Sequence, residues 1–133
     1  MKKTILIIED NEQNLYLATF LLERNGFEVE SARDGTEGIA MANQIKPDLI
    51  LLDIQLPEID GYAVARALRQ NPALKETPIV AVTSYAMPGD RERTIEAGCT
   101  GYIEKPINPD TFKAEIAKYI KPAGGTKNDN SDC

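Results

Sequence analysis

Carboxylate side chains follow two short apolar segments, at points where a buried strand would end. The segment TILII is followed by Glu9 and Asp10, and the segment LILL runs directly into Asp53. A charge is costly to bury without a partner, and carboxylates that share a site raise one another's pKa values. A divalent cation that prefers oxygen ligands, such as Mg²⁺, relieves this repulsion. The three acids therefore predict a magnesium site, if the fold brings the two strand ends together.

Two further apolar segments end in groups that suit phosphoryl chemistry. VAVTS places the hydroxyl of Thr83 at a strand end, and GYIEK does the same for the ammonium of Lys105. Phosphoryl transfer depends mainly on positioning and on neutralising charge at the phosphoryl oxygens. With Mg²⁺ and Lys105 supplying positive charge, Asp53 can attack phosphorus and form an acyl phosphate. The combination predicts that Asp53 is phosphorylated.

Apolar segments alternate along the chain with segments of helical periodicity. Strands are expected at residues 4–9, 27–32, 48–53, 78–84 and 101–105. Helices are expected at 11–25, 34–45, 60–70 and 90–97, and at the end of the chain after Asn108 as a cap and Pro109 as first residue. This alternation predicts an α/β fold, a doubly wound three-layer sandwich with five parallel strands in the order 2-1-3-4-5. Ligands of such folds bind at the carboxyl ends of the strands, where the acids are expected.

Length, charge and composition narrow the function further. The 133 residues suit one domain, expected at residues 1–121, and the polar, glycine-rich stretch 122–133 predicts a disordered tail. A net charge of −6 argues against nucleic acid as a partner, and no segment has the roughly 18 apolar residues of a membrane span. With no histidine and two cysteines, there is no disulfide framework. We expect a reduced, cytoplasmic protein.

Four motifs, each at the end of a different expected strand, carry a family resemblance. IIED, LILLDIQLP, VAVTS and YIEKP, in this order over about residues 3–120, resemble the CheY-like receiver domain of bacterial two-component response regulators. Within this family, the chain most resembles single-domain cell-cycle regulators of the DivK type. This narrower resemblance rests on the segments EDNEQN and DIQLPEIDG and on the expected lack of an output domain. The resemblance implies a flavodoxin-like fold and Asp53 as phosphoacceptor. It also implies Mg²⁺ bound directly by Asp10 and Asp53, by the backbone carbonyl of Gln55, and through water by Glu9.

The resemblance also implies how the phosphorylated state is read. Lys105 would contact a phosphoryl oxygen, with a cis peptide bond to Pro106. Thr83 would be the switch hydroxyl and Tyr102 the aromatic residue that follows it. The family often has aspartate where this chain has Glu9, so we expect metal binding with altered outer geometry.

Residues around the acids have further implied roles. Docking of the phosphodonor's histidine helix is assigned to a rim formed by Asn11, Asn14, Leu15 and Pro106. Gln55 and Tyr85, each two positions after a site residue, are expected to line the path of water to the acyl phosphate. The bulk of Tyr85 predicts a long-lived phosphorylated state.

The favoured function is a signalling switch without enzymatic turnover beyond slow Mg²⁺-dependent self-phosphorylation and autodephosphorylation. A histidine kinase or phosphotransfer protein would phosphorylate Asp53 and change the affinity for an unidentified downstream protein, with the chain a monomer or a weak phosphorylation-dependent homodimer. An aspartate-nucleophile phosphatase is the alternative enzyme, although Gln55 stands where such enzymes have a second aspartate. An FMN carrier is disfavoured by the acids, and a phosphorylation-independent adaptor by the set of Asp53, Thr83 and Lys105. Taken singly, each of these residues also suits an ordinary structural role.

Overall fold

A computed structural model describes residues 2–56, 59–84 and 89–120 of the chain. Tyr85, the end of the predicted domain and the predicted tail 122–133 lie outside the described residues. In chain order, the elements are β1 (Thr4–Ile8), α1 (Glu12–Arg24), β2 (Glu28–Ala32), α2 (Gly35–Ile45), β3 (Leu49–Asp53), α3 (Gly61–Arg69), the short 3₁₀ turn η1 (Pro72–Leu74), β4 (Ile79–Thr83), α4 (Asp90–Glu96), β5 (Gly101–Glu104) and α5 (Phe112–Ala117).

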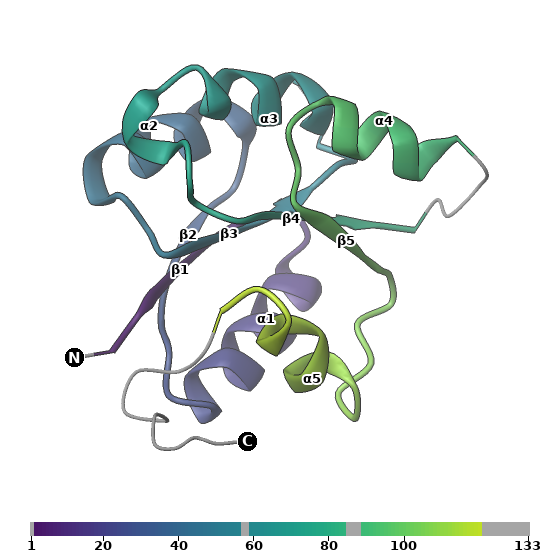
Figure 1. The fold of residues 1–133 in the computed structure, drawn as a ribbon. Helices are drawn as coiled ribbons and strands as arrows, with labels where there is room; N and C mark the ends of the chain where they lie inside the picture. The colour runs from purple at the N-terminus through teal and green to yellow at the C-terminus, as the bar shows by residue number, and fades with distance from the viewer. Residues whose placement is uncertain (1, 57–58, 85–88, 121–133) are drawn as a thin grey trace.

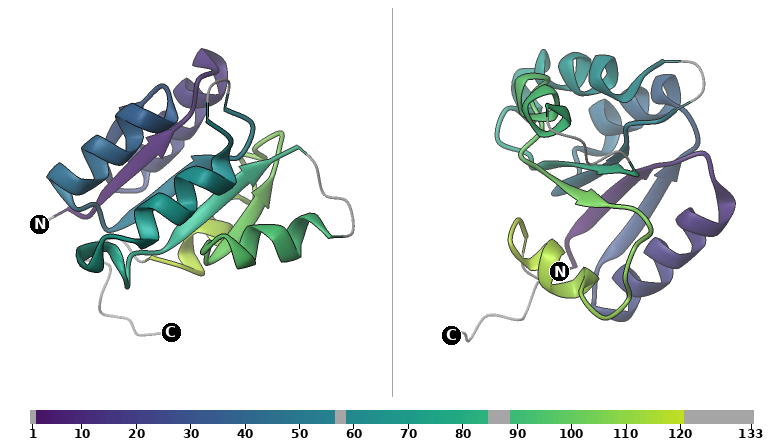
Figure 2. Two further views of the ribbon diagram at one scale, coloured as in Figure 1. Left: turned by 90° about the horizontal axis from the view of Figure 1, so that it is seen from above. Right: turned by 90° about the vertical axis from the view of Figure 1, so that its right-hand side faces the viewer.

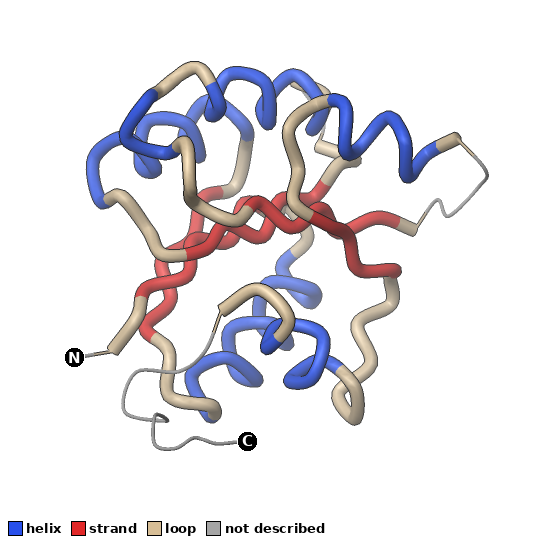
Figure 3. Tube along the Cα trace, in the orientation of Figure 1, coloured by secondary structure: helices blue, strands red, loops and turns tan. Residues whose placement is uncertain are grey.

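The five strands form one sheet in the order β2-β1-β3-β4-β5, and every neighbouring pair is parallel. Helices α2, α3 and α4 cover one face and α1 and α5 the other (Figures 1 and 2). The central layer of strands between two layers of helices is also visible when the chain is coloured by secondary structure (Figure 3). The predicted doubly wound three-layer sandwich is therefore confirmed.

The strands β1 and β3 are apolar on both faces because each face meets a helical layer. Leu6 and Ile8 contribute to the core under α2, α3 and α4, whereas Ile5 and Ile7 contribute to the core under α1 and α5. All five residues of β3 are buried, including its last residue, Asp53. Burial on both faces explains the continuous apolar run in the sequence. The carboxylate of Asp53 therefore lies at the end of a strand that is shielded from solvent.

Three of the helices whose starts the sequence predicts have a side-chain cap. Asn11, Asp34 and Asp60 each accept a hydrogen bond from the backbone N–H three residues further on. An N-cap of this kind satisfies one of the free amides in the first turn. The cap of α1 matters for function because it fixes the start of that helix directly after Glu9 and Asp10.

The last helix begins later than the sequence predicts. Its first residue is Phe112, not Pro109, and Thr111 occupies the cap position. Asn108 Oδ1 accepts the N–H of Asp110 at 2.9 Å, and the carbonyl of Asn108 accepts the N–H groups of Thr111 and Phe112. Asn108 therefore closes a separate turn before the helix, since a turn uses the same side-chain bond as a cap.

Arg69, the last residue of α3, joins three separate segments. Its Nε donates to the carbonyl of Gly98 at 2.8 Å, and its Nη1 donates to the carbonyls of Leu74 and Thr77, both at 2.7 Å. Gly98 has a φ of 110°, and a Cβ at this position would lie 2.6 Å from Arg69 Cγ. Glycine is therefore required here both for its backbone conformation and for the arginine that passes over it.

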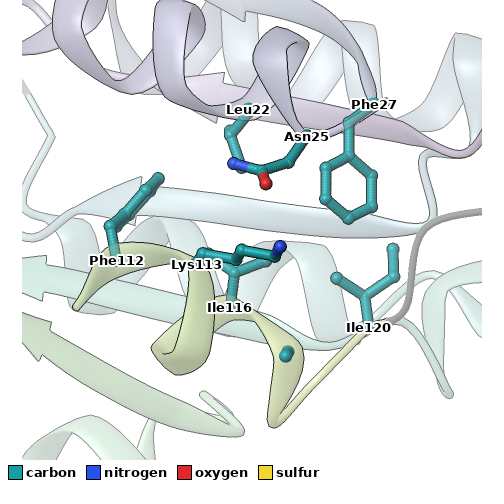
Figure 4. Close-up of a pocket in the computed structure, with 8 residues that line it drawn as sticks. Leu22, Asn25, Phe27, Phe112, Lys113, Ile116 and Ile120 are labelled. Atoms are coloured by element: carbon teal, nitrogen blue, oxygen red, sulfur yellow. The ribbon is translucent and has the colours of Figure 1, made fainter. Parts of the chain in front are cut away.

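A small apolar cavity lies between α1 and α5 (Figure 4). Its volume is about 40 Å³, and its lining residues include Leu22, Phe27, Phe112, Ile116 and Ile120. Because Phe27 directly precedes β2, the cavity lies toward the amino ends of the strands, away from the acids. A space of this size and polarity is a packing gap, too small for any ligand beyond about one water molecule.

Candidate functional site

The acids that the sequence singles out lie together at one edge of the sheet. Ile8 pairs with Leu52, so the residues that follow them, Glu9 and Asp53, lie side by side at the carboxyl ends of β1 and β3. One carboxylate oxygen from each of Glu9, Asp10 and Asp53 lies within 4.8 Å of the other two. Glu9 and Asp53 are 4% and 2% exposed, whereas Asp10 is exposed. The site is thus an acidic cluster with one side open to solvent.

The ammonium of Lys105 reaches this cluster from the end of β5. Its Nζ lies 3.2 Å from Asp53 Oδ1 and 3.4 Å from Glu9 Oε1, and the lysine side chain is 14% exposed. The peptide bond from Lys105 to Pro106 is cis, as expected. One cation therefore faces two buried carboxylates, and the cluster keeps a net negative charge when all the acids are ionised.

That imbalance adds to the effect of burial on the pKa of Glu9. The pKa of Glu9 is raised from 4.5 to about 7, mainly by burial and then by the hydrogen bond and the negative charge of Asp53. The N–H of Asn11, which donates to Glu9 Oε2 at 3.2 Å, and the charge of Lys105 act in the opposite direction. Clustered carboxylate oxygens short of cationic partners are the donor set of a hard divalent cation such as Mg²⁺.

The chain turns sharply after Asp53 to keep the site compact. The N–H of Gln55 donates to Asp53 Oδ1 at 2.9 Å, and the N–H of Gly61 donates to the carbonyl of Ile54 at 3.0 Å. A Cβ at Gly61 would collide with the backbone of Ile54 and would lie 2.9 Å from the Asp53 carbonyl oxygen. Glycine at this position permits the close approach of the two backbones and explains the end of the DIQLPEIDG motif.

The side chain of Gln55 contacts the loop that follows β4. Its Oε1 accepts hydrogen bonds from the N–H of Ser84 at 3.2 Å and from the Ser84 hydroxyl at 2.8 Å. Ser84 is the last residue of the VAVTS segment, and the sequence alone does not indicate this contact. Only the pairing of β3 with β4 places it beside Gln55, 29 residues earlier in the chain.

The two predicted switch residues lie on the same face of the sheet. Thr83 is 4% exposed and ends β4, while Tyr102 in β5 is half-buried and pairs with Ala81, two residues before Thr83. Residues two apart in a strand share a face, so Thr83 and Tyr102 are diagonal neighbours facing the α4 side. Arg91 of α4 lies over the Tyr102 ring, 5.0 Å from its centroid, an interaction that the sequence did not indicate.

The predicted docking residues flank the acids on two sides. Asn11 is exposed at the start of α1, Asn14 and Leu15 are half-buried in its first turns, and Pro106 is exposed directly after Lys105. Leu15 also packs against the core under α1 and α5, so part of its surface is structural. The position of Tyr85 is outside the described residues, and its predicted role stays a prediction.

Sequence comparison defines the class of protein. Residues 5–117 match the family of the response regulator receiver domain, and the chain belongs to this family. It is similar to the polar-differentiation response regulator DivK of Brucella anthropi, with 43% identity over 123 residues, covering 92% of this chain and all of the relative. DivK of Brucella ovis matches to the same extent.

Solved structures give the same classification. Chemotaxis protein CheY4 of Vibrio cholerae has a TM-score of 0.86 at 28% identity, covering 90% of this chain and all of that one. The receiver domain of a Pseudomonas aeruginosa sensor histidine kinase has a TM-score of 0.82 at 31% identity, with coverage of 90% and 98%. That structure has a magnesium ion coordinated in its active-site cleft. Among the helices described for the present chain, none has the length and apolar character to cross a membrane.

Proposed function

We propose that this chain is a phosphorylation-dependent switch whose phosphoacceptor is Asp53. The observation that carries the proposal is the position of the Lys105 ammonium against Asp53 Oδ1, beside the acids of β1. A buried aspartate that faces a lysine and a potential metal site is equipped to attack a phosphoryl group whose charge both cations neutralise. Lys105 would hold a phosphoryl oxygen after transfer.

Magnesium would be held by the carboxylates of Asp10 and Asp53 and by the backbone carbonyl of Gln55, with Glu9 acting through a water. The metal would supply charge neutralisation at the phosphoryl oxygens. Asp10 is exposed and its carboxylate lies within 4.8 Å of the other two, so the set can adjust around a cation that enters from solvent. The longer side chain of Glu9, buried beside Lys105, suits an outer position better than a direct bond.

The phosphoryl group would be read by Thr83 and Tyr102. A phosphoryl group on Asp53 adds acceptor oxygens near the end of β4, and the Thr83 hydroxyl can donate to one of them. Movement of Thr83 would leave space for Tyr102, its diagonal neighbour on the same face. Because Tyr102 contacts α4 through Arg91, the change would reach the surface formed by α4, β5 and α5.

The donor would be a histidine kinase or a histidine-containing phosphotransfer protein that docks beside Asn11, Asn14, Leu15 and Pro106. The output would be altered affinity for a downstream protein. Turnover as a phosphatase is disfavoured because the side chain two positions after Asp53 is an amide that carries no acid or base.

The proposal is tested by the intact mass of the protein after incubation with acetyl phosphate and Mg²⁺. We expect one phosphate adduct in the wild type, none in Asp53→Asn and none when EDTA removes the metal. Asp110→Asn, which removes an exposed carboxylate outside the cluster, is the matched control and should retain the adduct. An adduct that persists in Asp53→Asn, or no adduct in the wild type with Mg²⁺ bound, would contradict the proposal.

A further inference from the structure

Gln55 and Ser84 bridge the two loops that leave β3 and β4 beside the phosphoacceptor. Gln55 is two residues after Asp53 and donates its backbone N–H to Asp53 Oδ1. Its side-chain Oε1 accepts two hydrogen bonds from Ser84, at 3.2 Å from the backbone N–H and at 2.8 Å from the hydroxyl. The amide therefore has a defined position next to Asp53.

The chemistry of Ser84 also determines which way the amide faces. A backbone N–H can only donate, so Gln55 must present its oxygen to Ser84 and direct its NH₂ group elsewhere. The hydroxyl of Ser84 donates to the same oxygen and occupies a second lone pair. The only strong acceptor on the Gln55 side chain is thereby engaged, and what remains are two donors.

Loss of the phosphoryl group from Asp53 is a displacement by water. The water oxygen bonds to phosphorus, the bond from phosphorus to the Asp53 oxygen breaks, and that oxygen keeps the electron pair as a carboxylate. The water hydrogens leave with the dihydrogen phosphate product. An attacking water is aligned best by a group that accepts one of its hydrogens, and a neighbouring NH₂ group cannot do this.

We propose that Ser84 is a positioning residue that prolongs the phosphorylated state. Its two hydrogen bonds to the side-chain oxygen Oε1 of Gln55 occupy that acceptor. While Ser84 holds Oε1, Gln55 offers the hydrolytic water no acceptor. When the hydroxyl contact is lost, one lone pair of Oε1 is free to accept a hydrogen of that water, while the N–H of Ser84 still holds the amide in place. The inference rests on the proposed phosphorylation of Asp53 and adds a determinant of its lifetime.

The test is a double-mutant cycle on the decay of the phosphate adduct. Protein is phosphorylated with acetyl phosphate and Mg²⁺, freed of donor, and followed by intact mass. Ser84→Ala removes the shorter of the two hydrogen bonds, and we expect decay to accelerate about fivefold, the rate equivalent of one ordinary hydrogen bond. Ser84→Thr keeps the hydroxyl and should decay at close to the wild-type rate.

The Gln55→Met background distinguishes an effect of Ser84 on the position of the Gln55 amide from an effect of its size on the access of water to Asp53. Methionine has similar length and no amide, so Ser84→Ala should change nothing there. Equal acceleration in both backgrounds would overturn the inference, because Ser84 would then act by its size alone. The side-chain amide NMR signal of Gln55 in unphosphorylated protein gives an independent readout, and we expect Ser84→Ala to shift it. An unshifted signal would also overturn the inference.

Failure of the inference and failure of the proposed function give different results. An adduct that forms and decays at the same rate in wild type and Ser84→Ala overturns only the role of Ser84. If no adduct forms in the wild type with Mg²⁺ present, the function proposed for Asp53 falls, and the lifetime inference falls with it.

Discussion

The guanidinium of Arg91 lies over the ring of Tyr102 and donates to its hydroxyl, so one residue of α4 contacts the aromatic side chain of β5 in two ways. The distances are 5.0 Å to the ring centroid and 3.4 Å from Nη2 to the hydroxyl oxygen. A second arginine of α4, Arg93, lies over Tyr62 of α3 at 4.4 Å. The helix nearest the predicted switch is therefore attached to its neighbours by arginine–aromatic contacts.

Arg91→Ala should favour the conformation that the protein adopts when Asp53 is phosphorylated. The contact holds Tyr102 in its present position, and a cation over an aromatic ring at a partly exposed site is worth about 0.5–1 kcal/mol. Its loss should raise the apparent affinity for beryllofluoride and Mg²⁺, a mimic of the phosphoryl group, by about two- to fivefold. Titration followed by tyrosine ring NMR measures this. Arg66→Ala, an exposed arginine of α3, is the control, and an affinity unchanged in Arg91→Ala would contradict the coupling.

Without Mg²⁺, the protein should lose stability as the pH rises from 5 to 8. The folded-state pKa of Glu9 is raised from 4.5 to about 7, mainly by burial. Below pH 4.5 the group is protonated in both states and costs nothing. Above pH 7 it is charged in the folded state at a cost on the order of 3 kcal/mol.

Glu9→Gln should remove most of this pH dependence and be more stable than wild type at pH 8. Urea unfolding in EDTA at pH 5 and pH 8 gives the comparison, with Glu28→Gln at the exposed sheet edge as the control. Parallel pH profiles for wild type and Glu9→Gln would show that the burial of this carboxyl carries no penalty.

Lys105→Met should destabilise the metal-free protein and slow phosphorylation. Removing the cation leaves Asp53 and Glu9 buried without their shared partner, which costs about 3 kcal/mol in comparable buried pairs. The loss should be largest at pH 8 in EDTA and smaller with Mg²⁺, which supplies positive charge to the same acids. Phosphorylation by acetyl phosphate should fall at least about tenfold. Lys113→Met is the exposed control, and equal losses with and without Mg²⁺ would argue that Lys105 acts through packing alone.

Arg69→Met should destabilise the fold by about 2–4 kcal/mol without affecting the chemistry at Asp53. Methionine retains the apolar stem but removes the guanidinium from the carbonyls of Gly98, Leu74 and Thr77, of which Leu74 keeps the N–H of Thr77 as a donor at 3.2 Å. The midpoint of urea unfolding measures the loss, and the adduct mass of the folded variant shows that phosphorylation persists. Arg66→Met provides the matched change on the exposed side of α3. A midpoint shift no larger than that of Arg66→Met would mean that water replaces the guanidinium at these carbonyls.

The fold and the acidic cluster could be predicted because both depend on patterns local to each strand. A continuous apolar run identifies a strand buried on both faces, and parallel strands place their last residues at one edge. The proximity of Glu9 and Asp53 follows from that rule, although the two residues are 44 positions apart in the sequence.

Other features depend on where a long side chain ends, which periodicity does not specify. Gln55 could not be connected with Ser84, nor Arg91 with Tyr102, because each pair joins separate elements through flexible side chains. The predicted start of α5 was wrong because the side chain of Asn108 makes the same kind of hydrogen bond in a turn as it would make as a helix cap. The roles of Tyr85, Thr83 and the docking rim stay predictions.

The attachment of Arg69 to Gly98 gives the two ends of α4 unequal mechanical roles. The carboxyl end is fixed to α3 through this hydrogen bond, whereas the amino end starts at Gly89, which has a φ of 98° and no side chain to cap the helix. With its carboxyl end held at Gly98 and its first turn attached to the sheet through Arg91 and Tyr102, a movement of Tyr102 would turn the helix about Gly98, with the largest displacement at the first turn. Arg91 lies in that first turn, so a small change at Tyr102 would be amplified where a partner protein could detect it.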